Sequence, residues 1–431
     1  MHHSHTTMVP SLLASTLLLG LAAGCGGVEA SPDGAFEESR SSRARITTPA
    51  VSDADRAAFA QGQRRFAVDA YRAMAAEPGN FVYSPHSIQS ALAMAWAGAR
   101  GSTEAQMATA LRFGLPQDRL HAAFNALDQG LAARAARPAE SGRRFQLRVS
   151  NALFGQEGFQ ILPGYLDTLA ESYGAGVKRL DIVADPEAAR QRINAWVGEQ
   201  TERRIPELLG RGSINGLTRL VLTNAVYFNA SWDRPFAPTA TAPAPWRASD
   251  AAPRMVPMMN RADSLSYAEG DGWQAVEIPY VGGEVAMLLM LPAEGRMAEF
   301  ERGLTPERVE EITRGLGTRM VQLTVPTFRF RKNTSLKALL RGLGMSDAFE
   351  PGSADFAGIN GRRDLYVQDV MHEGFIGVDE RGTEAAAATA VTFGDTSAPQ
   401  PATFRADRPF VFAIRDRVSG SLLFLGRVAA P

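Results

Sequence analysis

Few residues of this sequence have the types and spacing that enzyme chemistry requires. Beyond the first five residues the only histidines are His86, His121 and His372, so a serine-hydrolase triad would have to use one of them. There is no Gly-x-Ser-x-Gly elbow, and His372-Glu373 lacks the second histidine of a zinc protease. A single cysteine excludes a zinc site built on several thiolates. We therefore expect no catalytic site, no metal and no cofactor.

Composition narrows the range of partners. The 431 residues carry 45 Lys and Arg against 46 Asp and Glu, a formal net charge of -1. Nucleic-acid binding depends on a basic surface that displaces counterions, so we expect no nucleic-acid partner. The lone Cys25 also rules out an intramolecular disulfide. Stability must therefore come from packing of the 45% apolar residues.

A run of small side chains follows a predicted strand that ends near Val378. After a turn at Gly382 the chain reads Thr383-Glu-Ala-Ala-Ala-Ala-Thr-Ala390. Alanine is the best helix former, so one interpretation is a short helix capped by Thr383. The alternative is a segment that slides into a crowded sheet, with alternate residues facing the core: Thr383, Ala385, Ala387 and Thr389. Residues 393–402, with Gly, Asp and two Pro, predict an exposed loop beyond it.

The elements around this segment mix helices and strands irregularly. Apolar residues recur at helical spacing over Asp53 to Ala76, and an almost wholly apolar helix is predicted from Ser84 to Ala99. Strand-like runs appear at 145–154 and 219–232, and after Trp232 short strands separated by Pro and Gly dominate. With no repeat and no linker-like break, the pattern predicts one α+β domain over 53–431.

The amino terminus has the features of an export signal. The apolar run Val9 to Ala23 is too short to span a bilayer, and Leu21-Ala-Ala-Gly-Cys25 behind it resembles the lipobox of bacterial lipoproteins. The resemblance implies a lipoprotein signal peptide over 1–25 and a lipid on Cys25, which would anchor the protein in the bacterial cell envelope. An ordinary secretory signal is the alternative. Residues 26–52, rich in Gly, Ser, Arg and Glu, are predicted to be a flexible tether.

From Asp53 to Pro431 the chain resembles the serpin family. The resemblance rests on the segment around Gly382 and on several blocks in family order: Asn80 to Ile88, Thr223 to Trp232, Glu277 to Tyr280, Met287 to Pro292, Leu343 to Phe349 and Asp407 to Phe410. It implies a monomeric serpin fold with three β-sheets, about nine helices and an exposed reactive-centre loop at about 381–403. In that family a protease cleaves the loop, which then inserts into the main sheet as an extra strand and traps the protease.

The same resemblance assigns roles to single residues. Ser84, Ser87, Asn224 and His372 match the shutter, where the central strands part, and Trp232 matches the breach, where the loop enters. A buried His372 needs partners for both ring nitrogens, and an Asn carboxamide with Ser hydroxyls can supply them. The hinge of the loop is formed by Glu380, Gly382, Thr383, Ala385, Ala387 and Thr389.

The position of the cleaved bond follows from two counts. Sixteen residues on from Glu380 the bond is Thr396-Ser397, whereas eleven residues back from Pro409 is Ala398; Phe393 is a third candidate. Glu384 to Thr403 contains no Lys or Arg, so a trypsin-like pocket would bury an unpaired carboxylate.

We therefore expect an inhibitor of elastase-like or subtilisin-like serine endopeptidases, with cysteine endopeptidases as a further option. A non-inhibitory serpin-fold protein that binds ligands or serves as a scaffold is the alternative. Bulky or charged residues in the hinge would favour that alternative, and only Glu384 is charged between Thr383 and Ala390.

Overall fold

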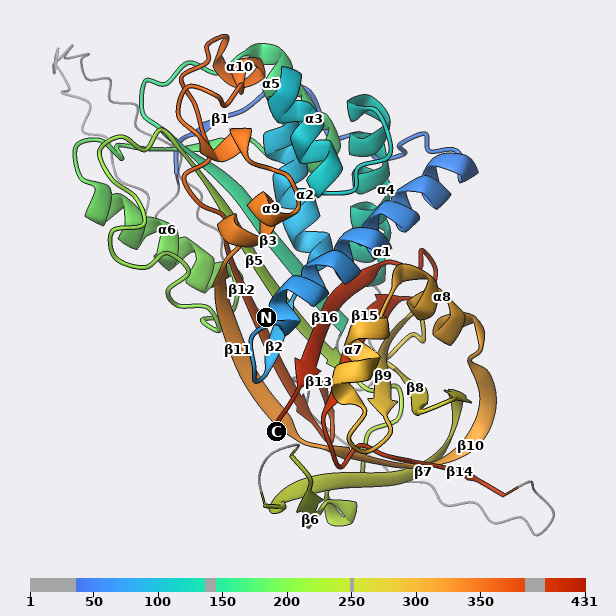
Figure 1. Ribbon diagram of the computed structural model, residues 1–431. Coiled ribbons are helices and arrows are strands. Elements are labelled where there is room, and N and C mark those ends of the chain that lie inside the picture. Colours follow the sequence, from blue (N-terminus) through green and yellow to red (C-terminus); the bar gives the residue numbers. More distant parts are fainter. Residues whose placement is uncertain (1–35, 136–144, 249–251, 384–399) are drawn as a thin grey trace, which may run out of the picture. The chain divides into compact units, whose positions relative to one another are not determined.

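A seven-stranded sheet brings together strands from distant parts of the chain (Figure 1). The structure is a computed structural model that describes residues 36–135, 145–248, 252–383 and 400–431. Residues Glu37–Pro431 form one compact unit, distinct from Met1–Phe36. The strand order is β1 (Glu38–Ser39), β4 (Val177–Leu180), β3 (Phe145–Gln156), β5 (Leu220–Ser231), β13 (Gly382–Thr383), β12 (Met371–Asp379) and β11 (Phe328–Ser335).

The remaining described strands pair into a second, nine-stranded network. Its order is β14 (Ala402–Arg405), β10 (Gly317–Pro326), β7 (Arg254–Gly270), β8 (Trp273–Pro279), β9 (Val285–Pro292), β15 (Phe410–Asp416), β16 (Leu422–Val428) and β2 (Phe81–Tyr83), with β6 (Ala242–Trp246) beside β7. The long strand β7 pairs with β6 and β10 and also with β8. The three expected sheets are therefore the seven-stranded sheet and two parts of this network that share β7.

Ten α-helices surround the sheets in the described ranges, and the mixed α+β architecture agrees with the predicted fold class. They are α1 (Asp53–Ala75), α2 (Pro85–Trp96), α3 (Gly101–Ala110), α4 (Gln117–Ala135), α5 (Pro163–Tyr173), α6 (Pro186–Gln200), α7 (Met297–Gly303), α8 (Pro306–Arg314), α9 (Lys337–Gly342) and α10 (Ala357–Asn360). As expected, α2 starts at Ser84, whose hydroxyl accepts from the Ser87 N–H and so caps the helix. Within the described ranges no helix is both long enough and apolar enough to cross a membrane.

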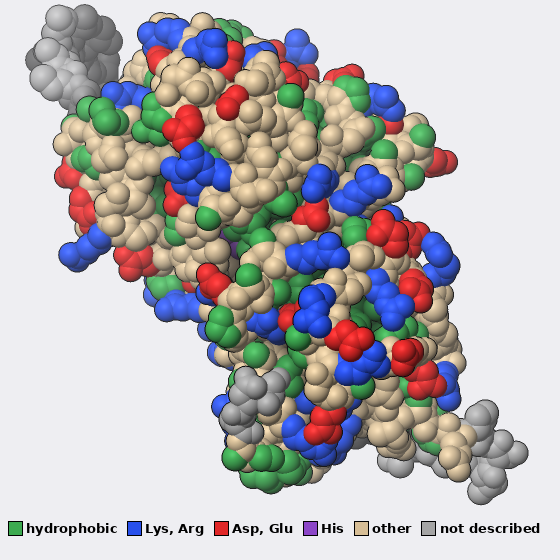
Figure 2. Space-filling view, in the orientation of Figure 1, with side chains coloured by type: hydrophobic (Ala, Val, Ile, Leu, Met, Phe, Trp, Pro, Cys, Tyr) green, Lys and Arg blue, Asp and Glu red, His purple; other side chains and the backbone are tan. Residues whose placement is uncertain are grey.

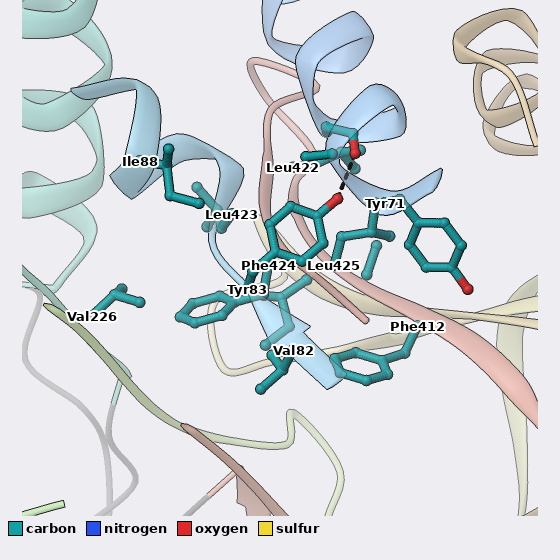
Figure 3. Close-up of a cluster of buried hydrophobic side chains, with 14 of the residues drawn as sticks. Tyr71, Val82, Tyr83, Ile88, Val226, Phe412, Leu422, Leu423, Phe424 and Leu425 are labelled. Atoms are coloured by element: carbon teal, nitrogen blue, oxygen red, sulfur yellow. Dashed lines mark hydrogen bonds between the residues drawn. The ribbon is translucent and has the colours of Figure 1, made fainter. Parts of the chain in front are cut away.

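The hydrophobic core lies where α1 and α2 cover the sheets. Helix α2 contacts both β5 of the first sheet and β16 of the second. Figure 3 shows Val226 of β5 in the same apolar cluster as Tyr83 of β2 and Phe424 of β16. The one polar group of Tyr83 is satisfied, because its hydroxyl donates to the Ala67 carbonyl in α1. This core holds together the elements that form the centre of the seven-stranded sheet.

The amino-terminal part of the folded unit corrects one prediction. We expected a flexible tether over 26–52, but β1 pairs antiparallel with β4 at the edge of the sheet. Further along, Arg45 donates to Asn125 (2.9 Å) and pairs with Asp128 (2.5 Å), and the Ile46 N–H donates to the Glu171 carbonyl (2.9 Å). The folded unit thus begins near Glu37 instead of Asp53. A polar segment without helical or strand periodicity can still be held by an open sheet edge and by acidic side chains.

Candidate functional site

The segment after the predicted turn lies inside the seven-stranded sheet. Strand β13 sits between β5 and β12 and is antiparallel to both. Gly382 is opposite Ser231 and Asp379, and Thr383 is opposite Ala230 and Val378. Thr383 is therefore a strand residue, whereas residues 384–390, on which the choice between the two interpretations of this segment depends, lie outside the described ranges. The chain begins to insert before any cleavage.

Gly382 is required by the closeness of β5. Its φ is +156°, and a Cβ at this position would lie 2.2 Å from the Ala230 carbonyl oxygen and 2.7 Å from the Ser231 Cα. Both atoms belong to the backbone of a central strand and cannot move aside cheaply. Only glycine allows the chain to enter the sheet at this point.

Aromatic side chains line the point where β13 enters. Thr383 is 1% exposed, and its hydroxyl is hydrogen-bonded to the Tyr280 hydroxyl at 2.8 Å. The Tyr280 ring stacks on Trp232, with centroids 4.6 Å apart and planes 11° from parallel. The Trp232 indole N–H donates to the Asp379 carbonyl (2.9 Å), so this residue holds the end of β12 beside the inserted pair. Burial raises the pKa of Tyr280, which stays a neutral hydrogen-bonding group.

The turn before β13 is fixed from both sides. The Asp379 carboxylate accepts from the backbone N–H groups of Arg381 (2.9 Å) and Gly382 (3.2 Å). Glu380 accepts from the Thr241 hydroxyl at 2.7 Å, and its carbonyl accepts from the Phe236 N–H. Glu380, predicted as a hinge residue, thus ties the turn to the 236–241 segment.

Further along the sheet from β13, a polar cluster joins β5 and β12 directly. His372 and Asn224 are partners in the parallel pairing of the two strands, and their side chains are hydrogen-bonded from Nδ1 to Oδ1 at 2.5 Å. The Asn224 amide donates in turn to the Ser87 hydroxyl (2.6 Å) and to the Asn151 carboxamide oxygen (2.7 Å). The structure therefore brings the predicted residues Ser84, Ser87, Asn224 and His372 into one buried network.

The partners of His372 determine its protonation. Its Nε2 accepts the Ser84 backbone N–H at 3.1 Å, so Nε2 carries no proton and Nδ1–H is the donor to Asn224. Burial lowers the pKa of His372 to about 3, and the ring is neutral at physiological pH. We expected serine hydroxyls as partners, but the second partner is a backbone N–H. This is a structural histidine bonded to neutral groups, with no carboxylate to orient it as a base.

Two residues of the site were not foreseen in these roles. Asn151 of β3 lies opposite Asn224 in the β3–β5 pairing and completes the polar network. Tyr280, within one of the matched sequence blocks, supplies the hydroxyl that meets Thr383. No sequence motif marks either residue, because each of them lies far in the sequence from its partner. Only the strand register would have revealed them.

On the side of the polar cluster away from β13, β12 begins at Met371 and its pairing with β5 stops. β5 and β12 pair only over Asn224–Val226 and His372–Gly374. An apolar cavity of about 70 Å³ lies at this end of the sheet. Its walls include Leu153, Leu220, Leu222, Ile359, Leu365 and Met371.

The other two histidines of the folded unit and two neighbouring glutamates have structural partners. The ring of His121 meets the Tyr173 hydroxyl at 2.7 Å, and His86 lies 3.3 Å from the Gln63 amide. Glu310 and Glu311 on α8 form ion pairs with arginines of the same helix. No cluster of three potential metal ligands occurs in the described ranges.

Several predicted residues lie outside the described ranges. They are Cys25, the hinge residues Ala385, Ala387 and Thr389, and the candidates for the cleaved bond, Phe393, Thr396, Ser397 and Ala398.

Fold and site together define a class of protein: an α+β domain whose central sheet already contains the first residues of the segment that joins β12 to β14. The family model described as "Serpin (serine protease inhibitor)" matches residues 61–431. The leukocyte elastase inhibitor of Equus caballus is 38% identical over 377 residues, covering 85% of this chain and 97% of that protein. The chain belongs to the serpin family.

Solved structures agree with this assignment. Native tengpin, a thermophilic serpin, has a TM-score of 0.79 and 26% identity over 90% of this chain and 97% of its own. Thyroxine-binding globulin in complex with thyroxine has a TM-score of 0.75 and 28% identity over 86% of this chain and 99% of its own. The named relatives thus include both a protease inhibitor and a small-molecule binder.

Proposed function

We propose that this protein inhibits serine endopeptidases by insertion of its cleaved reactive loop into the seven-stranded sheet. The observation that carries the proposal is strand β13, because Gly382 and Thr383 already occupy the position between β5 and β12 that an inserted strand would extend. Each further residue adds ladder hydrogen bonds at roughly 1 kcal/mol net, and about a dozen of them give on the order of 10 kcal/mol. That free energy is sufficient to distort a protease held as an acyl-enzyme.

The chemistry of the loop indicates the class of target. Thr396 and Ala398 suit the small or broadly apolar pockets of elastase-like and subtilisin-like proteases, whereas Glu384 to Thr403 offers no basic residue to a trypsin-like pocket. The relatives named as leukocyte elastase inhibitors support the same class.

The test is incubation with pancreatic elastase, subtilisin and trypsin. Detergent-stable complexes are expected with the first two and not with trypsin. The mass of the released carboxy-terminal peptide identifies the bond, because a fragment that starts at Ser397 supports cleavage after Thr396 and one that starts at Pro399 supports Ala398. Stable trapping of trypsin would contradict the assignment of the target class.

The alternative, a serpin-fold binding protein, has support in the thyroxine-binding globulin neighbour. It predicts that elastase and subtilisin cleave the loop without forming a stable complex. Nucleic acid is not favoured as its ligand, since Lys and Arg lie interspersed with Asp and Glu on the face seen in Figure 2.

We also propose that Cys25 carries a lipid anchor in the envelope of a bacterial cell. Two acyl chains anchor a protein stably at about 0.8 kcal/mol per buried methylene. In the native host the wild type should sediment with membranes, and Cys25→Ser should be released. A wild-type protein that is soluble and unacylated there would favour the secretory alternative.

A further inference from the structure

Exposed apolar side chains gather at one end of the seven-stranded sheet. In the described ranges, seven large apolar residues are exposed: Ile46, Leu162, Val183, Leu217, Met255, Met320 and Val418. Three of these, Leu162 (39% exposed), Val183 (42%) and Leu217 (74%), lie in the connections that lead into α5, α6 and β5. Single exposed apolar residues are ordinary on a protein surface, whereas a group of them marks an interaction site.

Strand pairing brings these three connections together. The last residues of β3 and β4 lie beside the first residues of β5. The Val183 N–H donates to the side chain of the last residue of β3 (2.8 Å), and a Cβ on Gly216 would lie 4.0 Å from the Val183 carbonyl oxygen. The Leu162 N–H donates to the Ile359 carbonyl (2.7 Å), and Ile359 lines the apolar cavity that also borders the connection into β5. Leu162, Val183 and Leu217 therefore mark one surface, which we call the anchor end.

The chain enters the folded unit at the anchor end. β1 is antiparallel to β4, and the Glu37 carbonyl accepts from the Arg179 N–H (2.7 Å). Traced back toward its amino terminus, the chain therefore runs along β4 in the direction of Val183. Twelve residue steps separate Glu37 from Cys25, and a chain of that length spans at most about 40 Å.

The reactive loop leaves the sheet at the opposite end. β5 runs from Leu220, beside the anchor end, to Ser231, which is opposite Gly382 of β13. Eleven residue steps of about 3.3 Å separate the two ends of β5 by about 36 Å. In Figure 1, β1, α5 and α10 lie together at the top, whereas β13, β14 and β6 lie in the lower half. To place the loop end on a bilayer, the chain from Cys25 would need nearly its whole extended length.

Two arginines beside the anchor end are paired within the protein. They follow Gly361, whose Cβ would lie 3.9 Å from the Leu162 side chain. Arg362 pairs with Asp364 (3.2 Å) and Arg363 with the Asp355 carboxylate (3.3 Å). We therefore expect contacts at this end to be made by apolar groups and not to require an anionic partner.

Building on the lipid anchor proposed above for Cys25, we propose that the anchor end rests on the bilayer surface. The side chains of Leu162, Val183 and Leu217 enter the boundary between headgroups and acyl chains, where apolar groups leave water. This orientation holds the loop end away from the membrane. Proteases in the surrounding medium can then reach the loop.

The first experiment uses the full chain, acylated at Cys25, in phosphatidylcholine vesicles. Cys25 is the only cysteine, so Leu217→Cys supplies one free thiol for an environment-sensitive NBD fluorophore. Nitroxides on the acyl chains should quench this fluorophore about twofold or more, because it lies at the membrane boundary. Met255→Cys, a similarly exposed apolar position (63%) on β7 beside β6, is the matched control and should keep its emission. Addition of phosphatidylglycerol should change neither result.

The second experiment tests the contact itself. With the fluorophore on Leu162→Cys, the added substitution Leu217→Glu should reduce the quenching about twofold, because a carboxylate is unfavourable at the membrane boundary. Val418→Glu introduces the same charge at an exposed valine (66%) in the turn between β15 and β16. It should leave the quenching unchanged.

The outcomes distinguish failure of the anchor from failure of the orientation. A Cys25 without acyl chains, seen by mass spectrometry of the protein from its native host, would overturn both. An acylated protein whose Leu217→Cys fluorophore is quenched no more than that of Met255→Cys would overturn the orientation alone. Stronger quenching at Met255→Cys would mean that the loop end faces the bilayer.

Discussion

The two ends of the gap between β5 and β12 are built from different side chains. At one end, which we call the entry end, β13 is already inserted and is held by the hydrogen bond between the hydroxyls of Thr383 and Tyr280 and by Trp232. In the middle the strands are joined directly through Asn224 and His372, and beyond that lies an apolar cavity. The sheet is therefore open at one end and closed by a buried polar bond a few residues further on. Two residues are already inserted, and a strand that continued between His372 and Asn224 would have to break that bond.

The largest effect is expected at the open end. Thr383→Arg places a guanidinium at a position that is 1% exposed, where an unpaired charge is strongly unfavourable. The loop should still be cleaved, but the fraction of protease trapped should fall by about tenfold or more as the protein becomes a substrate.

The matched control for that variant is Thr403→Arg, an exposed position on β14 at the far end of the loop. It should trap elastase as the wild type does, measured as detergent-stable complex per mole of protease. Trapping by Thr383→Arg at the wild-type level would show that inhibition does not require residue 383 to be buried between β5 and β12.

Removing the bond in the middle should destabilise the intact protein. Asn224→Ala leaves the His372 N–H and the Ser87 and Asn151 groups without their shared partner, at a cost of about 2–4 kcal/mol. Urea unfolding of the intact form measures this loss. Asn229→Ala changes the same residue type on the same strand outside the network and should cost about 1 kcal/mol. Equal losses of unfolding free energy in the two variants would show that the network around Asn224 stabilises the protein no more than a single buried hydrogen bond does.

Acid should destabilise the intact protein through buried histidines, one of which, His372, lies in the middle of the gap. The pKa of His372 is lowered to about 3 and that of His121 to about 4, whereas unfolded histidines titrate near 6.5. The unfolded state therefore binds protons first as the pH falls, and stability decreases. Between pH 7 and pH 5 each of these histidines should cost about 2 kcal/mol.

Urea unfolding at the two pH values tests this linkage. His121→Phe removes one titrating group and should show a smaller loss by about 2 kcal/mol. An unchanged loss in that variant would indicate that carboxylates, and not buried histidines, set the acid sensitivity.

The smallest effect is expected from Tyr280→Phe. The ring can still stack on Trp232, and only the hydrogen bond to Thr383 is lost, at about 1 kcal/mol. Hydrogen exchange of the Thr383 amide should speed up about fivefold, while the amides of β12 near His372 should exchange as before. Faster exchange at both places would mean that the two ends of the gap open together.

Part of this site could be predicted from the sequence. Ser84 before Pro85 predicts a capped helix, and the helix begins there. The run of small side chains after the turn at Gly382 predicts entry into a crowded sheet, and Gly382 and Thr383 indeed pair with β5 and β12. The alanines are also compatible with a helix, because intrinsic helix propensity carries no information about neighbouring strands.

Other features depend on contacts between residues far apart in the chain. Asn151 and Asn224 meet only because β3 and β5 pair in a particular register, and a shift of one residue would place them on opposite faces. The tether expected over 26–52 is partly bound for a similar reason, since nothing in Glu38–Ser39 indicates that the edge of β4 is available.

The family, the mixed α+β fold, the hinge composition and the lack of a basic residue in the loop can all be predicted from the chain's residues, because they depend on local patterns and side-chain types. The folded arrangement is needed to show that Thr383 is already inserted, that His372 is neutral and bonded to Asn224, and that an apolar cavity lies beyond them. These properties arise from strand register and burial, which depend on distances between residues more than a hundred positions apart.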